Sequence, residues 1–337
     1  MTQLLSHNAN AFTSTVLASL SAERTTLLHE FLVGNWKFVL EAYIAQKQVK
    51  SVETKKTYHK YLKVFFEWMD SLGIALPSLN KDTLVSFIEE LSQSGHSQKT
   101  INLYIVSLRG FFSWTAEDEV RLYPNIASRL KTYHEQSDNG HVKMHLSSKQ
   151  KDALMEYMKT RPLRDYVMVC LMVLRGLRTI EVSRINVDDL RQIDNHKILF
   201  IQGKGRQDKS RFVVLSDSLD ELIKKYMSSR GRILSAGPLF VGQGRGSHGN
   251  RISPRTIQKI SKDALRAIGI DSAYYTPHSF RHTAGVDIIK NGGTIYDVQQ
   301  VLGHSSTATS EIYLQSAASD LRMENPPERF LDKNISL

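Results

Sequence analysis

The sequence predicts a two-domain protein that is mainly α-helical and carries one small antiparallel β-sheet. Apolar residues recur at three- and four-residue spacing through most of the chain, which is typical of helices packed on a core. Two β-prone segments in the second half flank a short glycine turn, which predicts a hairpin. A polar stretch at residues 133–145 breaks the periodicity, and 337 residues suffice for two cores.

The composition limits the class of partner. A hydrophobic fraction of 41% is ordinary for a globular protein. The net charge of +10 and the pI near 9.5 suit a polyanion such as nucleic acid, and would also serve solubility alone. Residues 135–337 carry 30 Lys and Arg against 22 Asp and Glu, whereas residues 1–134 carry 14 against 12. This uneven distribution favours a polyanionic partner.

The sequence also indicates a compartment. Cys170 is the single cysteine, so the chain can form neither an internal disulfide nor a cysteine metal cluster. The apolar segment around it, residues 166–174, is much shorter than the roughly 20 residues that cross a bilayer. No basic segment leads into an apolar one at the N-terminus. We therefore expect a cytoplasmic protein that does not bind a membrane.

The first domain is predicted over residues 28–134 and is entirely helical. An N-terminal extension, residues 1–27, precedes it and is expected to be a loose arm or a partner-docking helix. The predicted helices are Leu28–Gln46, Ser51–Gly73, Asp82–Ser92, Ser97–Trp114 and Asn125–Lys131. The fourth of them is rich in aromatic residues, which indicates that it lies in the core.

One face of helix 51–73 is basic. Lys56, Lys60 and Lys63 lie opposite the apolar residues of this helix. They are placed to contact phosphates or to lie in a groove. A solvated helix surface would show the same pattern, so both interpretations stay open.

The second domain is predicted over residues 146–337, after a linker at residues 135–145. Its predicted elements are a helix capped within Leu146–Lys149, a buried helix Arg164–Leu174, a hairpin of His196–Gln202 and Arg211–Leu215, a helix Leu219–Ser228 and a basic helix that begins at Ser253. Arg255 and Lys259 on the last helix are placed to lie along a major groove.

A helix start near the C-terminus has the features of an anion site. Thr276 is predicted to cap a helix whose first residue is Pro277. His278 and Arg281 then lie three residues apart in the first turn, on one face. The amide groups and the dipole of a helix start favour an anion at this place.

A second short helix follows and is predicted to present a histidine. Thr294 begins it with Asp297 at the capping-box position, and Gly303 ends it, so His304 projects from the turn. Tyr313 comes nine residues later, after a run of Ser and Thr that begins at residue 305 and is expected to cap the last helix. A helical tyrosine is normally a core residue, but this one shares a short region with an arginine and two histidines.

The order of these motifs resembles the tyrosine recombinase (phage integrase) family in its two-domain, Xer-like form. His-x-x-Arg at 278–281 is followed by Leu-Gly-His at 302–304 and then by the tyrosine. Upstream, Gly176-Leu-Arg-Thr-Ile-Glu181 is similar to the first arginine box of the family, and Gly203-Lys-Gly205 is similar to its hairpin lysine. Ser97-Gln-Lys-Thr100 resembles the DNA-facing helix start of the core-binding domain, which adds Lys99 to the expected DNA contacts.

The resemblance implies how the phosphate is held and how the leaving group departs. Arg178 and Arg281 would bind the scissile phosphate, because guanidinium groups stay charged and grip phosphate oxygens in pairs. Lys204 would protonate the departing 5′ oxygen. Lys209 is the alternative, since the hairpin is longer than is usual in the family and Val214 stands where proline is common.

The resemblance also implies the nucleophile and its helpers. Tyr313 would attack the phosphorus and form a 3′-phosphotyrosyl bond. His278 would take its proton or bind a phosphate oxygen, and His304 would position the phosphate from the other side. Glu181 would orient His278 or an arginine, whereas His282 is expected to be structural. This chemistry requires no cofactor and no metal, and the histidine spacing suits no zinc motif.

The implied fold is a C-shaped clamp, in which a helical core-binding domain and a catalytic domain grip double-stranded DNA. The implied function is site-specific recombination through a Holliday junction, by a homotetramer on two sites in the nucleoid. Integration, excision and dimer resolution all fit, with or without an accessory DNA-bending protein or a partner recombinase. Two alternatives are a type IB topoisomerase and a catalytically idle DNA-binding protein, and the complete set of active-site residues argues against the second.

The C-terminal segment is predicted to dock on a neighbouring protomer. Ala-Ala-Ser at 317–319 is expected to be a flexible join after the last catalytic residue. The apolar residues that would dock are Leu321, Met323, Phe330 and Leu331.

Overall fold

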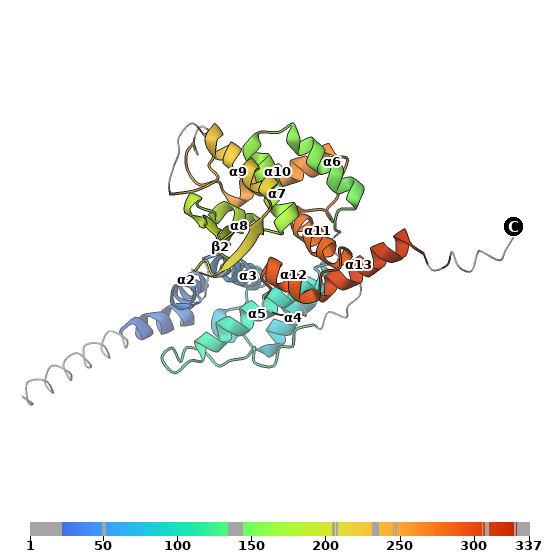
Figure 1. The fold of residues 1–337 in the computed structure, drawn as a ribbon. Coiled ribbons are helices and arrows are strands. Elements are labelled where there is room, and N and C mark those ends of the chain that lie inside the picture. Colours follow the sequence, from blue (N-terminus) through green and yellow to red (C-terminus); the bar gives the residue numbers. More distant parts are fainter. Residues whose placement is uncertain are drawn as a thin grey trace, which may run out of the picture. The chain divides into compact units, whose positions relative to one another are not determined.

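The computed structural model describes residues 22–48, 52–133, 144–203, 206, 208–230, 236–244, 246, 248–304, 306, 310–326 and 328. The chain divides into two compact units, residues 1–138 and residues 139–337. Helices make up most of both units, and a three-stranded antiparallel sheet lies in the second (Figure 1). The predicted fold class, mainly α with a small antiparallel sheet, is confirmed.

The first unit is built from helices around an aromatic core. Its elements are a helical segment at residues 22–32, α2 (Trp36–Gln46), α3 (Val52–Ser71), the 3-10 turn η1 (Leu76–Ser78), α4 (Lys81–Gln93) and α5 (Gln98–Thr115). Phe65 of α3 meets Phe87 of α4 with ring centroids 5.1 Å apart, and Phe66 meets Phe111 of α5 at 5.3 Å. These fully buried rings supply much of the apolar area that holds the helices together.

Two helix predictions in the first unit were wrong. Residues 28–46 form two helices rather than one, because Gly34 adopts a left-handed conformation with φ +81° and Asn35 then caps α2 through its side chain. Residues 125–131 form a turn at 126–129 and no helix. Pro124 precedes this turn, and short-range bonds such as Leu130 N–H to Ala127 O replace a helical ladder.

The second unit is organised around a buried helix. Its elements are α6 (Ser148–Lys159), α7 (Leu163–Arg175), α8 (Thr179–Arg184), η2 (Val187–Asp189), β1 (Leu190–Ile193), β2 (His196–Ile201), β3 (Arg211–Leu215), α9 (Asp217–Ser229), α10 (Pro254–Ala267), α11 (Pro277–Lys290), α12 (Ile295–Leu302) and α13 (Glu311–Glu324). Helix α7 contacts α6, α8, α9, α10 and α11. Gly176 ends α7 at φ +64°, where a β-carbon would lie 2.2 Å from Leu302 Cδ2.

The sheet has the order β1-β2-β3 and is antiparallel throughout. The predicted hairpin is β2 and β3, with Leu199 opposite Val213 and Phe200 opposite Phe212. Strand β1 was not predicted from the sequence. Its four residues, Leu-Arg-Gln-Ile, do not alternate between apolar and polar. Only Leu190 is even partly covered, so burial imposes no such pattern on the strand.

Three helices at the C-terminal end of the chain pack on one another and carry the motifs found in the sequence. Helix α11 contacts α12 and α13 (Figure 1, orange to red), and it also contacts α7. The expected flexible join at 317–319 was wrong, because α13 continues through it to Glu324 and Ala317 is fully buried. Alanine is the strongest helix former, and Val286 of α11 lies in the same apolar cluster.

Candidate active site

A buried carboxylate organises the first arginine motif. Arg178 caps α8, and its backbone N–H donates to Glu181 Oε2 at 2.9 Å while its Nη1 donates to Oε1 at 2.9 Å. Glu181 is only 1% exposed. A buried carboxylate requires charged partners, so Glu181 fixes both the main chain and the side chain of Arg178.

The second arginine lies beside the first, although the two are far apart in the sequence. The predicted start of α11 is confirmed, since Thr276 caps the helix and Pro277 is its first residue. Arg281 is buried and donates to the main-chain oxygens of Gly176, at 2.7 Å, and of Leu302. Its burial, followed by the charge of Arg178, lowers the pKa of Arg281 to about 10, so the guanidinium is charged at pH 7.

A third arginine completes this cluster and was missed from the sequence. Arg211, the first residue of β3, places Nη2 2.9 Å from Glu181 Oε2 and donates through Nη1 to Val301 O. Nη1 of Arg281 is 3.9 Å from the same Oε2. Three guanidinium groups thus surround one buried carboxylate. An arginine that opens an otherwise apolar strand was the available signal.

His304 follows the helix end that the sequence predicted. Thr294 and Asp297 form the capping box of α12, and Gly303 ends it at φ +64°. A β-carbon on Gly303 would lie 2.5 Å from Arg211 Cδ, so glycine is required here for space as well as for conformation. The predicted presentation of His304 from this turn is confirmed.

The His304 ring is neutral and fixed in orientation. Its Nδ1 lies 2.8 Å from the hydroxyl oxygen of Ser310, and its ring stacks on that of Tyr313 with centroids 5.8 Å apart. Burial, and then the positive charges of Arg281 and Arg178, lower the pKa of His304 to about 4. Ser310 is the cap residue of α13, yet its hydroxyl contacts the histidine and makes no side-chain capping bond.

Tyr313 is the third residue of α13 and is 7% exposed. Its ring packs against that of His304 and against that of His282, whose centroid is 4.9 Å away. Burial raises the pKa of the Tyr313 hydroxyl, while the charges of Arg281 and Arg178 and a hydrogen bond with Arg281 oppose that rise. The tyrosine therefore lies in the guanidinium cluster of its own chain and is not displayed on a free surface.

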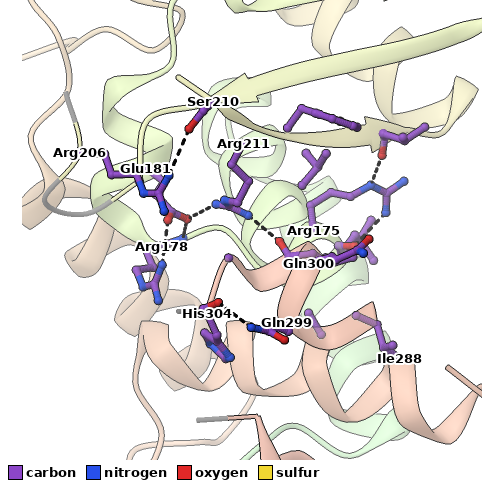
Figure 2. A pocket seen from close by; sticks show the side chains of 18 residues that line it. Arg175, Arg178, Glu181, Arg206, Ser210, Arg211, Ile288, Gln299, Gln300 and His304 are labelled. Atoms are coloured by element: carbon purple, nitrogen blue, oxygen red, sulfur yellow. Dashed lines mark hydrogen bonds and ion pairs between the residues drawn. The ribbon is translucent and has the colours of Figure 1, made fainter. Parts of the chain in front are cut away.

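A pocket of about 1060 Å³ opens over this cluster. Figure 2 shows Glu181 between Arg178 and Arg211, with His304 and Gln299 facing them from α12 and its C-terminal turn. Gly203 lines the same pocket, but Lys204, which follows it, lies outside the described residues. Lys209 is held elsewhere, since its Nζ lies 2.6 Å from both carboxylate oxygens of the buried Asp189.

The remaining predicted site residues are exposed. His278 lies on the surface in the first turn of α11, and on α10 the side chains of Arg255 and Lys259 are exposed. In the first unit Lys99 is exposed at the start of α5. The helix α3 lysines are exposed too: Lys56 pairs with Glu53 at 2.9 Å, Lys63 pairs with Glu67 at 3.6 Å, and Lys60 lies 5.7 Å from the ring centre of Tyr61.

Two further properties concern the described part of the chain. No group of three or more His, Cys, Asp or Glu side chains within it could hold a metal ion. Within the same residues, no helix is both long enough and apolar enough to span a membrane.

Two family models match the sequence. The phage integrase family matches residues 145–320, and the N-terminal SAM-like domain of phage integrases matches residues 40–119. The first match covers more than half of the chain and contains the whole arginine, histidine and tyrosine cluster. The chain belongs to the phage integrase family and is a site-specific DNA recombinase, an enzyme that transfers DNA strands.

Known relatives match most of the chain and nearly all of their own length. The tyrosine recombinase XerD of Listeria monocytogenes is 27% identical over 295 residues, which cover 83% of this chain and 93% of the relative. XerA of Thermococcus kodakarensis is 25% identical over a segment that covers 84% of this chain and 92% of the relative. A crystal structure of the XerH site-specific recombinase bound to a palindromic difH substrate has the same fold, with a TM-score of 0.69 and 18% identity. The match covers 91% of this chain and 94% of the XerH chain.

Proposed function

We propose that Tyr313 is the nucleophile that cleaves and rejoins DNA in this recombinase. The observation that carries the proposal is the burial of Tyr313 beside Arg281 and the stacked ring of His304, within one chain. In the proposed step the Tyr313 hydroxyl oxygen bonds to the scissile phosphorus as the bond to the 5′ oxygen breaks. The 3′-phosphotyrosyl product keeps the energy of a phosphodiester for rejoining, so the step consumes no nucleotide.

Arg178 and Arg281 hold the phosphate in this proposal. Arg178 lines the pocket, and Arg281 is buried beside it, so both charges are fixed in place before the DNA binds. Glu181 orients both groups and Arg211, and it neutralises part of the repulsion among them. Removing one such contact in an enzyme lowers the rate on the order of 100- to 1000-fold.

The two motif histidines have different tasks. His304 is neutral at pH 7 because its pKa is about 4, so it serves as a hydrogen-bond donor to a phosphate oxygen rather than as an acid. Its Nδ1 contact with Ser310 leaves Nε2 for the phosphate. His278 is exposed in the first turn of α11 and accepts the proton of the Tyr313 hydroxyl, whose raised pKa makes a base useful.

Lys204 is proposed as the acid that protonates the departing 5′ oxygen. Gly203, the residue before it in the sequence, lines the pocket, which supports this assignment. The ion pair between Lys209 and the buried Asp189 supports it further. A lysine held by a buried carboxylate is a poor proton donor to a phosphate elsewhere.

The two units are proposed to clamp double-stranded DNA, with residues 28–134 as the core-binding domain, residues 135–145 as the linker and residues 146–337 as the catalytic domain. The exposed lysines Lys56, Lys60, Lys63 and Lys99, together with Arg255 and Lys259, supply phosphate contacts. Residues 1–27 are an extension to this clamp. The enzyme is proposed to act in the cytoplasm, on the nucleoid, because its substrate is DNA.

Recombination is proposed to proceed through a Holliday junction in a homotetramer on two sites. One solved structure with the same fold is a lambda integrase tetramer bound to a Holliday junction, with a TM-score of 0.61. Leu321 and Met323 of α13 are exposed and suit a contact with a neighbour, while Phe330 and Leu331 lie outside the described residues. The relatives are recombinases, so a type IB topoisomerase is not favoured.

Replacement of the nucleophile tests the proposal. Random-sequence duplexes are first selected for binding to the native chain, and the recovered site is prepared as a nicked suicide duplex. The native chain should form a covalent adduct, whereas Tyr313→Phe should form none and should bind the duplex within about twofold of native affinity, because only a hydroxyl is lost. Tyr274→Phe, which alters an exposed tyrosine, is the control. An adduct that persists in Tyr313→Phe would place the nucleophile elsewhere.

A further inference from the structure

A residue near the start of the second unit contacts the helix that carries Tyr313. His145 Nε2 lies 2.8 Å from Asp320 Oδ2, and the two side chains are 17% and 27% exposed. Asp320 follows Tyr313 by seven residues, or two helical turns, so both lie on the same face of α13. The bond from His145 therefore holds α13 by the face that carries Tyr313.

Aromatic contacts connect the same two places by a second route. The rings of His145 and His282 are 5.6 Å apart between centroids, and those of His282 and Tyr313 are 4.9 Å apart. His282 is buried on α11, the helix that also carries Arg281. A shift of His145 would therefore displace the Tyr313 ring through the packed ring of His282 as well as through Asp320.

His145 is held in place by the residue that follows it. The backbone N–H of Leu146 donates to Thr283 Oγ1 at 2.9 Å, and this hydroxyl in turn donates to Ser279 O at 2.8 Å. Both Leu146 and Thr283 are buried. The backbone next to His145 is thus fixed, so only the His145 side chain has to be ordered when it binds the Asp320 carboxylate.

Asp320 accepts a second bond from α11. Lys290 Nζ lies 3.2 Å from Asp320 Oδ2 and 2.6 Å from Glu324 Oε1. Lys290 and His145 therefore both bind Oδ2 of Asp320, and Lys290 also binds Glu324 one turn further along α13. In the first turn of α13, which contains Tyr313, Ser310 makes no side-chain capping bond, so the bonds to Asp320 and Glu324 add fixed points further along the helix.

We propose that His145 is a positioning residue that sets the location of Tyr313 through Asp320 and His282. The proposal rests on the proposed role of Tyr313 as the nucleophile. It extends the site to a residue near the start of the second unit, and it makes attack by Tyr313 depend on the position of His145. An error of about 1 Å in the placement of a reacting group can lower a rate 100-fold.

The test compares His145→Ala with two other variants of the full chain. His145→Gln restores an N–H donor at the reach of Nε2 and should recover most of what His145→Ala loses. Lys151→Ala is the matched control, because Lys151 forms a comparably covered ion pair at 2.7 Å with Asp287 of α11 and joins α6 to that helix without involving α13.

Two measurements separate positioning from folding and from DNA binding. Without DNA, amide hydrogen exchange in residues 311–324 should become about three- to tenfold faster in His145→Ala and stay native in Lys151→Ala, as expected for loss of one charge-assisted hydrogen bond. With saturating nicked suicide duplex, the adduct should form about tenfold more slowly in His145→Ala, while the Kd for the duplex changes less than twofold.

The results distinguish this proposal from the one on which it rests. If native protein forms a Tyr313-dependent adduct and His145→Ala matches Lys151→Ala in both exchange and rate, the positioning role is overturned and the proposed nucleophile stands. If native protein forms no adduct, the proposed nucleophile fails. Faster exchange confined to α13 in His145→Ala would then still show that His145 sets the placement of this helix.

Discussion

The ring of Tyr313 lies directly on the backbone of Gly285. A β-carbon built on Gly285 would be 2.5 Å from Tyr313 Cδ1 and 2.6 Å from Cε1, closer than any side chain tolerates. Gly285 is in the middle of α11, two residues after Thr283 and four after Arg281. The helix that carries Arg281, the proposed phosphate ligand, thus also provides the flat surface on which Tyr313, the proposed nucleophile, rests.

Gly285→Ala should separate cleavage from folding. Alanine stabilises a helix interior by about 1 kcal/mol relative to glycine, so the substitution should not destabilise α11 itself. The new methyl group must, however, displace the Tyr313 ring. We expect adduct formation to fall on the order of 100-fold with little change in DNA affinity. Gly246→Ala, where no atom lies within 4 Å of the added carbon, is the control. A native rate in Gly285→Ala would show that the ring leaves Gly285 before it attacks.

Arg211→Lys should weaken both stability and cleavage. Lysine keeps the charge but cannot reach Glu181 and Val301 O together. We expect a loss of about 1–3 kcal/mol in the free energy of unfolding, measured by urea denaturation, because a buried acceptor and a buried carboxylate lose a partner. Adduct formation should fall at least tenfold. Arg191→Lys on β1, whose guanidinium stacks over Phe200, should change neither property.

The leaving-group acid can be identified with a modified substrate. Lys204→Ala should slow cleavage strongly, and a duplex with a 5′-bridging sulfur should restore the rate, since a thiolate departs without a proton. Lys209→Ala should leave cleavage of either substrate nearly unchanged at a temperature where it is folded. Its free energy of unfolding should drop by about 1–3 kcal/mol, because the buried Asp189 loses a hydrogen-bond partner. Sulfur rescue of Lys209→Ala alone would reverse the assignment.

Acid should destabilise the second unit through His304. Its pKa in the folded protein is about 4, below the value near 6.5 of an unfolded chain. Between these values the unfolded state binds more protons, so the stability that neutral His304 contributes is present above pH 6.5 and is lost as the pH falls toward 4. His304→Gln should show a smaller decrease in urea midpoint between pH 7 and pH 5. An equal decrease in both proteins would contradict the depressed pKa.

Binding should weaken steeply with salt, with a slope of roughly −0.9 for each phosphate neutralised. The double change Lys56→Glu and Lys60→Glu should flatten this slope if α3 lies against DNA. Lys81→Glu, at the exposed start of α4, serves as the comparison. A slope that stays native in the double variant would leave α3 as a solvated surface.

Much of the candidate site could be predicted because its elements are set by local chemistry. Thr276 with Pro277, the pair Thr294 and Asp297, and the left-handed Gly303 each fix a helix boundary through groups at most a few residues apart. The same locality placed Tyr313 in the first turn of a helix. Where local patterns were weak, prediction failed, as in the short exposed strand β1.

What the sequence could not provide were contacts between distant residues. Arg211 meets Val301 across 90 positions, Leu146 meets Thr283 across 137, and His145 meets Asp320 across 175. No spacing rule links such pairs, because their meeting depends on how α7, α11 and α13 pack. The sequence determined the class of enzyme and the motif residues, since caps and motifs act over a few residues. Only the tertiary structure decided which charges surround Glu181 and what holds Tyr313, because burial and packing are properties of the folded whole.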